Sequence, residues 1–470
     1  MEIYKFRSTN YMIDEIENEI IYFSPKEDLN DPIEGYIKLY FNGDEMAWKG
    51  LFKNYFISFY NKVHSFFIIR MIEESQDNES KKLLIELKNN FRRIDFYNKN
   101  LIPLKDNKII LPYEEYIDKF LNLNVVKSLI SNFSTKNMII DRNELLFFLQ
   151  SIHFQVVKII YEKINIKFNF KNFDNEVIDE FLNNYFSINL SDKSKLLREY
   201  NEFIKSYHYN LKLEFQNTEY HKMSLMIFID FPSEYVKQLE YIMFPNCYIS
   251  CFSKTYSNSS MWGNYSENHK GIVLIFDTKE YNGKKSLEIE SVSGFNSDGY
   301  LKKFSDMELQ EVKYDVDHKK INFFDMLGNF PIPQIDYLFS EKDKRSSFLL
   351  EREKDINEWR KKYNEILNNI YLVKTKDWKS EEEYRILLRD ILGIFLDVSN
   401  RRCRYNFKSL KGIILGMKTS ESNKIKIIDI ISKKCSMYGI KDFKIYQAYF
   451  DEEEKNIKIN NTNLFYNTVV

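Results

Sequence analysis

Residues 260–277 read SMWGNYSENHKGIVLIFD, and the residue pattern changes inside this stretch. Its first part is short, polar and aromatic, and it ends at Gly271. Its second part, IVLIFD, is an apolar run with the length and β-branched composition of a strand. We therefore expect a short helix that stops at the glycine and leads into a strand.

Strand patterns continue beyond this point. They are separated by polar or glycine-containing turns and read SLEIESV, EVKYD, EYRILLRD, KGIILGM and FKIYQAYF. The first forty residues read as strand, helix and strand, with the sequences IYKFR, YMIDEIENE and IIYFS. One long helix is expected over about 341–369. The simplest fold class is α+β, with the N-terminal strands joining the C-terminal ones in one sheet system.

The middle of the chain has a different, helical character. Asp141-Arg-Asn-Glu144 has capping-box spacing, and apolar residues then recur at helical intervals. They are Leu145, Phe148, Leu149, Ile152, Val156 and Ile159. We therefore expect residues 1–44 and 245–470 to form the two parts of an α+β domain, with a large all-α insertion over 45–244.

Composition limits the class of protein. The 470 residues carry 68 Lys+Arg and 69 Asp+Glu, so the net charge of -1 does not indicate nucleic acid, although a basic patch remains possible. The N-terminus lacks a secretory pattern, and apolar runs such as residues 54–71 are interrupted by lysine, so we expect a cytoplasmic chain without a membrane segment. The abundance of Asn, Lys and Ile is typical of A+T-rich bacterial genes. The four cysteines form no CxxC pair, which favours reduced, mostly buried thiols.

Trp262, Tyr265 and His269 stand at i, i+3 and i+7, so one short helix would present all three on one face. Such a stripe is most often part of the core. The functional interpretation is an aromatic wall for a planar ligand, with His269 at its rim.

The chain resembles the largely bacterial domain-of-unknown-function family numbered 2971. The resemblance is carried, in order along the chain, by IYKFRS, IYFSPKEDLNDPIEG, CFSKTYSNSSMWGNYSENHKGIVLIFD, EVKYD, DWKSEEEYRIL and KGIILGMKTS. Asn264 departs from the family pattern, which commonly has a histidine at this position. The resemblance implies an association with bacterial conflict systems such as phage defence.

A looser resemblance connects the chain to ADP-ribosyltransferases. Arg7 ends the first strand, Ser24 ends the second, and Glu381-x-Glu383 enters a late strand, which is similar in kind and order to the Arg, Ser, Glu-x-Glu set of that family. The resemblance implies a split-sheet α+β unit that binds NAD in a cleft.

The chemistry can be stated from the residues. Breaking the bond between nicotinamide and ribose builds positive charge on the sugar, and a fixed carboxylate, here Glu383, would stabilise it. Glu381 would lie near the incoming nucleophile, Arg7 would hold diphosphate or ribose oxygens, and Ser24 would fix the cleft wall. The candidate catalytic residues are Glu383, Glu381 and His269, and the candidate NAD-binding residues are Arg7, Ser24, Trp262, Tyr265 and Asp31.

Several functions stay open. The leading hypothesis is an NAD-consuming enzyme that modifies a macromolecular acceptor or hydrolyses NAD. The first alternative is a non-catalytic nucleotide-binding or sensor protein whose helical block docks a partner protein. The second is a metal-dependent nuclease that uses Asp31, Glu34 and the carboxylates at 381 and 383. Arg385 would equally pair with Glu383 and make this segment structural.

Overall fold

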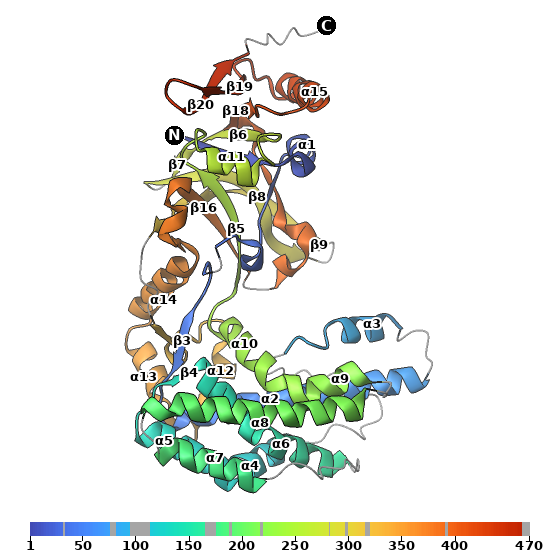
Figure 1. Ribbon diagram of the computed structural model, residues 1–470, viewed down its shortest axis with the longest axis vertical. Helices are drawn as coiled ribbons and strands as arrows, with labels where there is room; N and C mark the ends of the chain where they lie inside the picture. The colour runs from blue at the N-terminus through green and yellow to red at the C-terminus, as the bar shows by residue number, and fades with distance from the viewer. Residues whose placement is uncertain are drawn as a thin grey trace. The chain divides into compact units, whose positions relative to one another are not determined.

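The computed structural model describes residues 1–31, 33–75, 81–94, 113–164, 175–187, 190–216, 220–281, 283–296, 299–314, 320–390 and 393–462 (Figure 1). The chain has a mixed α+β fold and divides into two compact units. Unit 1 consists of Met1–Tyr36, Pro245–His318 and Asn364–Val470, and unit 2 consists of Ile37–Phe244 and Lys319–Tyr363. The expected domain ranges differ from these units in two respects: they place residues 37–44 with the N-terminal part of the α+β domain and residues 319–363 with its C-terminal part, whereas both stretches belong to unit 2.

Unit 1 contains an eight-stranded sheet that joins both ends of the chain. Its strand order is β10 (Gln310–Glu311), β16 (Glu383–Asp390), β5 (Asn246–Ser253), β1 (Glu2–Arg7), β6 (Ile272–Asp277), β18 (Leu410–Leu415), β19 (Lys444–Asp451) and β20 (Asn456–Asn461). Only the β18–β19 pair is parallel within the described part of this sheet. The runs IYKFR, IVLIFD, KGIILGM and FKIYQAYF therefore form four successive strands of this sheet, and EYRILLRD forms β16.

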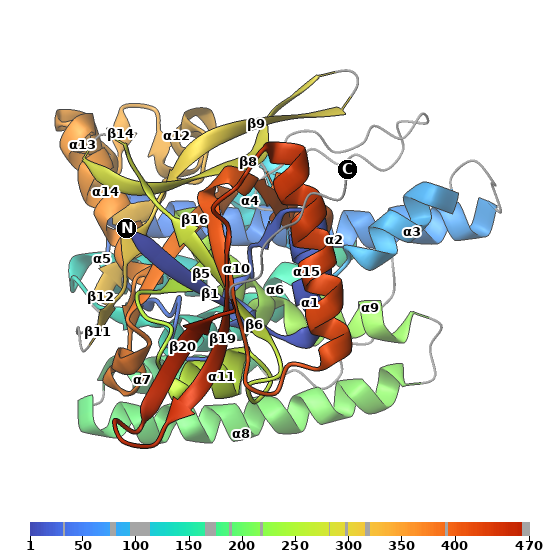
Figure 2. The ribbon, with the colours of Figure 1, turned by 90° about the horizontal axis from the view of Figure 1, so that it is seen from above.

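A second sheet covers one face of the first. It contains β2 (Ile20–Tyr22), β17 (Arg402–Tyr405), β8 (Lys284–Asn296), β7 (Lys279–Tyr281) and β9 (Gly299–Glu308), which pairs with β8. The main apolar core of unit 1 draws residues from both sheets and from α1 (Thr9–Glu17) and α15 (Glu421–Tyr438). Figures 1 and 2 show α1 and α15 side by side.

Successive side chains of β1 point to opposite faces of the sheet and pack in two different clusters. Ile3 belongs to the core between the sheets, whereas Tyr4 and Phe6 pack in a smaller cluster with α11 (Ser259–Tyr265). Because side chains alternate along a strand, Lys5 and Arg7 share the side of Ile3. This alternation places two cations on one face of the strand.

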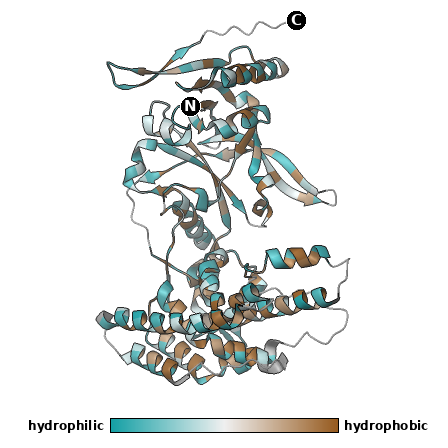
Figure 3. Ribbon diagram, turned by 45° about the vertical axis from the view of Figure 1, so that its right-hand side comes forward, coloured by the Kyte–Doolittle hydropathy of each residue, from teal (hydrophilic) through white to brown (hydrophobic). Residues whose placement is uncertain are grey.

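Unit 2 is mainly helical. Its described helices are α2 (Glu45–Ser75), α3 (Lys81–Asn89), α4 (Tyr113–Leu121), α5 (Asn124–Thr135), α6 (Arg142–Ile164), α7 (Asn175–Ser187), α8 (Leu190–Phe215), α9 (His221–Leu225), α10 (Phe231–Met243), α12 (Ile332–Phe339), α13 (Ser347–Lys354) and the start of α14 (Ile356–Tyr371). The helix α2 contacts α4, α5 and α12, and α6 contacts α8 and α10. Figure 3 shows hydrophobic residues along these helices, which is the pattern of a packed helical core.

The helix predicted from the capping box is α6. Asp141 Oδ1 accepts hydrogen bonds from the backbone N–H of Asn143 (2.8 Å) and Glu144 (2.9 Å), and Glu144 Oε2 accepts from the N–H of Asp141 (2.8 Å). The six apolar residues that follow at helical spacing are all buried. Residues 142–161 are, within the described part of the chain, the one segment long and apolar enough to cross a membrane, and 72% of it is buried in the structure.

The prediction of one helix over 341–369 was wrong. Two short strands, β13 (Ser340–Glu341) and β14 (Lys344–Arg345), come first, and two helices follow, α13 and α14. The break is at Asp355, whose backbone is not helical and whose Oδ1 accepts from the N–H of Asn357 (3.0 Å) and Glu358 (2.9 Å). Asp355 therefore caps α14 and ends α13, although the helical spacing of apolar residues continues through this position.

Candidate functional site

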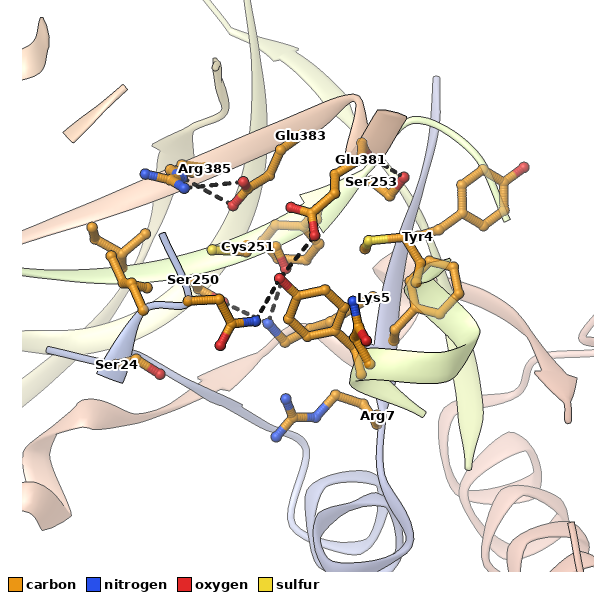
Figure 4. A pocket seen from close by; sticks show the side chains of 18 of the residues that line it. Tyr4, Lys5, Arg7, Ser24, Ser250, Cys251, Ser253, Glu381, Glu383 and Arg385 are labelled. Carbon is orange, nitrogen blue, oxygen red and sulfur yellow. Dashed lines mark hydrogen bonds and ion pairs between the residues drawn. The ribbon is translucent and has the colours of Figure 1, made fainter. Parts of the chain in front are cut away.

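A cavity of about 290 Å³ lies within unit 1. Its walls come from β1, the segment from Tyr22 to Glu34, β5, α11 and the stretch from Lys374 to Arg385. These segments are far apart in the sequence and meet only in the folded unit. Figure 4 shows Arg7 on one side of the cavity and Glu383 with Arg385 on the other.

The cavity lies where the pairing between β1 and β5 ends. These strands pair at one position, Tyr4 with Ser253, whereas β1 pairs with β6 along its whole length. Farther along, β5 pairs with Ser24: the Ser24 N–H donates to Ile249 O (2.9 Å), and the Ile249 N–H donates to Ser24 O (2.8 Å). The change of partner splits the sheet between β1 and β5, and residues on both sides of the split line the cavity.

Three carboxylates surround a buried lysine on one wall of the cavity. Lys374 Nζ lies 2.6 Å from Glu381 Oε2, 3.2 Å from Glu383 Oε2 and 3.3 Å from Glu34 Oε1. Arg385 donates through Nε to Glu383 Oε1 (2.9 Å) and through Nη2 to Glu383 Oε2 (3.0 Å), and it also pairs with Glu34. The pair of Arg385 with Glu383, considered as an alternative from the sequence, is therefore present.

These contacts set the charge state of the cluster. Burial alone would raise the pKa of Glu383, but Arg385 and Lys374 lower the pKa to about 2. Burial alone would lower the pKa of Lys374, and the carboxylates of Glu383 and Glu34 raise it instead. Burial raises the pKa of Glu34 in spite of Arg385 and Lys374. Glu383 is thus an anion at neutral pH, and two buried cations hold it in place.

Tyr265 joins two walls of the cavity. Its hydroxyl donates to Glu381 Oε1 (2.9 Å) and accepts from Asn30 Nδ2 (2.9 Å). The first wall belongs to the Glu381 segment and the second to the loop after Ser24. The aromatic ring predicted to contact a ligand is therefore placed in the cavity by hydrogen bonds at its polar end.

Trp262 and His269 lie outside the cavity. Trp262 is fully buried, its Nε1 donates to Tyr256 O (2.7 Å), and its ring packs edge-to-face on Phe6 with centroids 5.4 Å apart. The helix α11 ends at Tyr265, and Glu267, Asn268 and His269 have positive φ angles. One helical face with Trp262, Tyr265 and His269 is therefore absent from this described segment. The ring of His269 stacks on Trp262 with centroids 6.0 Å apart, and burial and Lys418 lower its pKa.

Asp31 is buried outside the cavity, where it joins the loop after Ser24 to the segment that contains Thr375. Its Oδ2 accepts from the backbone N–H (2.8 Å) and the hydroxyl (2.9 Å) of Thr375, and its Oδ1 accepts from the Ile33 N–H (3.1 Å). Three hydrogen bonds to one carboxylate are typical of a structural clamp. The clamp fixes Thr375, and with it the neighbouring Lys374.

Of the predicted residues, the structure brings together Arg7, Ser24, Tyr265, Glu381 and Glu383 in the cavity wall. It leaves Trp262, His269 and Asp31 outside. Sequence reasoning missed Lys374, which lies in the unremarkable stretch LVKTKD, and Lys5. Alternation along the predicted first strand places Lys5 on the same side as Arg7, and this signal would have found it.

The cysteines are free thiols. Cys251 is partly exposed and lines the cavity, and burial followed by the charge of Glu383 raises its pKa. Burial raises the pKa of Cys247 to about 12. The described residues contain no cluster of three potential metal ligands that includes these thiols.

Comparison with known proteins gives one result that bears on this site. None of the curated proteins and none of the solved structures matches the chain. A family model matches residues 261–386, which include Tyr265, Lys374 and the two paired glutamates. The family to which the chain shows similarity is the one described as "Protein of unknown function (DUF2971)", and residues 261–386 carry that similarity.

Proposed function

We propose that the cavity of unit 1 binds NAD and cleaves the bond between nicotinamide and ribose, as an ADP-ribosyltransferase-like enzyme. The observation that carries the proposal is the meeting of Arg7, Ser24, Tyr265, Glu381 and Glu383 in one cavity. These residues come from four distant segments, and the sequence predicts the same ligand for each of them. The split between β1 and β5 supports a split-sheet fold of this kind.

The proposed reaction uses charges that are already in place. Glu383 is ionised and fixed, so it can stabilise positive charge that develops on the ribose. Glu381, linked to Tyr265, lies beside it and would orient the nucleophile, which is water or a group on a macromolecular acceptor. Arg7 on the opposite wall would hold diphosphate oxygens through its planar group. The family resemblance alone adds a role in bacterial defence to this proposal.

A second candidate is a binding or sensor protein that holds a nucleotide without turnover. The observation that favours it is the saturation of Glu383 by Arg385 and Lys374, which reduces the field that the carboxylate exerts on a bound sugar. The nuclease hypothesis has less support, because the ammonium of Lys374 lies among the carboxylates that would hold the metal and Asp31 is engaged with Thr375.

The test is release of nicotinamide from NAD labelled in its nicotinamide ring, with and without cell extract as a source of acceptor. Glu383→Gln should bind NAD and release nicotinamide about a hundredfold more slowly than wild type. Glu308→Gln is the control, because Glu308 forms an exposed pair with Lys284 on the β9 hairpin. Thermal melts check that both variants are folded at the assay temperature.

Two results would decide against the enzyme. NAD binding without release of nicotinamide, with extract present, would leave the sensor function. If folded wild type and Glu383→Gln release nicotinamide at equal rates, Glu383 has no role in the reaction. Glu381→Gln separates the roles further, because it should reduce transfer to an acceptor more than hydrolysis.

A further inference from the structure

Lys5 is a buried amine in the cavity wall without a carboxylate partner. It is 5% exposed, and its Nζ donates to Ser250 Oγ (2.8 Å) and Cys251 O (3.2 Å). In the part of the chain that the structure describes, no carboxylate oxygen lies within 4.0 Å of this nitrogen. Lys374, in the same cavity, has three such neighbours. The two lysines therefore differ in their close charge partners.

Arg7 has an unfilled donor on the same side of β1. Its Nη2 pairs with Glu15, while its Nε is buried and has no hydrogen-bond partner among the described residues. The ammonium of Lys5 has three N–H donors, and its two acceptors use two of them. Lys5 and Arg7, at adjacent same-side positions of one strand, thus each have an N–H donor without an acceptor among the described residues, and both residues line the cavity.

A buried ammonium without a close carboxylate is costly, because burial removes its hydration and the more distant carboxylates of Glu15 and Glu383 compensate only part of this loss. Burial, followed by the charge of Arg7, lowers the pKa of Lys5 to about 8. Perturbed groups of this kind gather at functional sites. An anion bound in the cavity would supply the missing partner.

We propose that Lys5 and Arg7 form a subsite for the phosphate or diphosphate group of a nucleotide on the β1 wall of the cavity. The inference rests on the proposed function for its ligand, NAD, and it deepens that function by assigning the diphosphate to Lys5. Lys5 acts as a point charge and Arg7 offers a planar donor group, two complementary ways to hold phosphate oxygens. The nicotinamide ribose would then lie toward Glu381 and Glu383.

Proton linkage gives the subsite a pH signature. The groups that face Lys5 are Arg7 on β1, Glu15 on α1, Cys251 on β5 and Glu383 on β16. The pKa of Glu383 is about 2 and the pKa of Cys251 is raised, so both keep their charge state between pH 7 and 9. Burial raises the pKa of Glu15, and its ion pair with Arg7 opposes this rise. A bound phosphate stabilises the ammonium, so affinity should fall as the pH rises above about 8.

The experiment is calorimetric titration of ADP-ribose into the folded full chain between pH 7 and 9.5. The diphosphate of this probe keeps a constant charge in that range. At pH 7, Lys5→Gln should bind about tenfold or more weakly than wild type. Lys5→Arg should retain most of the affinity and lose its pH dependence, because arginine does not titrate in this range. Lys270→Gln, in an exposed turn, is the matched control.

Wild-type affinity for Lys5→Gln, confirmed as folded by thermal melting, would overturn the subsite. Failure of ADP-ribose, NAD and inorganic diphosphate to bind the wild-type chain would also overturn it. If ADP-ribose binds in a Lys5-dependent way but the protein releases no nicotinamide from NAD, the subsite is supported. That result would contradict only the proposed enzymatic activity.

Discussion

Lys374 Nζ lies 2.6 Å from Glu381 Oε2 inside the cavity of unit 1. The same nitrogen contacts Glu383, so one ammonium joins the two carboxylates of the Glu-x-Glu motif. An exposed acidic run would instead be solvated and free to move. The motif is thus part of a buried charge cluster, in which structural and chemical roles depend on the same contacts.

Removing the ammonium of Lys374 should destabilise the protein. Lys374→Met leaves three buried carboxylates with Arg385 as their remaining close cation in the described cluster, and we expect a loss of about 3 kcal/mol in the free energy of unfolding. Urea unfolding followed by circular dichroism measures this loss. Lys379→Met, at an exposed position of the same segment, should stay within about 0.5 kcal/mol of wild type. Equal effects of the two substitutions would contradict the cluster.

The contribution of Glu383 to stability should depend on acid pH. Its pKa falls from the ordinary 4.5 to about 2 on folding, so its pairing stabilises the protein fully above pH 4.5 and loses this effect as the pH falls toward 2. The difference in unfolding free energy between wild type and Glu383→Gln should therefore shrink over that range. A difference that is constant between pH 6 and 3 would show that the charge of Glu383 does not matter.

Lys5 should reduce stability in the absence of ligand. Its pKa of about 8 lies below the ordinary 10.5, so the charged form is disfavoured in the folded state. Lys5→Met should raise the free energy of unfolding at pH 7 by about 1 to 3 kcal/mol. Between pH 8 and 10.5 the unfolded chain binds more protons, wild type gains stability, and the advantage of the variant should shrink. A variant that is less stable than wild type at every pH would contradict this account of Lys5.

Substitutions at Trp262 and Tyr265 should have different effects: the first should reduce stability and the second should weaken ligand binding. Trp262→Phe removes buried volume and the hydrogen bond to Tyr256 O, so it should lower the unfolding free energy by about 1 to 3 kcal/mol with NAD affinity unchanged. Tyr265→Ala removes a ring that lines the cavity and should weaken NAD binding. Titration of NAD into both variants tests this pair, and reversed effects on affinity would place the ligand elsewhere.

Local patterns predicted the elements of the fold well. The capping box of Asp141 and Glu144 is a contact between residues three apart, so the sequence contains all of it. The break at Asp355 was missed because the apolar spacing on both sides fits one helix, and only the cap shows that there are two. The assignment of residues 319–363 to unit 2 depends on tertiary contacts that no local pattern carries.

The site residues that the sequence predicted are those whose type and order along the chain match a known catalytic set. Arg7, Ser24 and Glu383 were found by their order along the chain, and the fold brings them to one cavity. Lys374 gave no signal, because Glu34 is distant in the sequence and meets it only in the folded unit. Its other partners, Glu381 and Glu383, are seven and nine residues away, and no single strand or helix spacing joins all three residues. Trp262 and His269 were misplaced because their helical spacing assumed a helix that ends at Tyr265.

In the proposed complex, NAD occupies the cavity with its diphosphate on Lys5 and Arg7. The most direct measurement is a crystal structure of the protein with an NAD analogue in which carbon replaces the ring oxygen of the nicotinamide ribose, because this analogue cannot form the cationic sugar and stays intact. We predict diphosphate oxygens within hydrogen-bonding distance of Lys5 and Arg7, with the nicotinamide ribose beside Glu381 and Glu383. An empty cavity at saturating analogue, or an analogue bound on another surface, would contradict the claim.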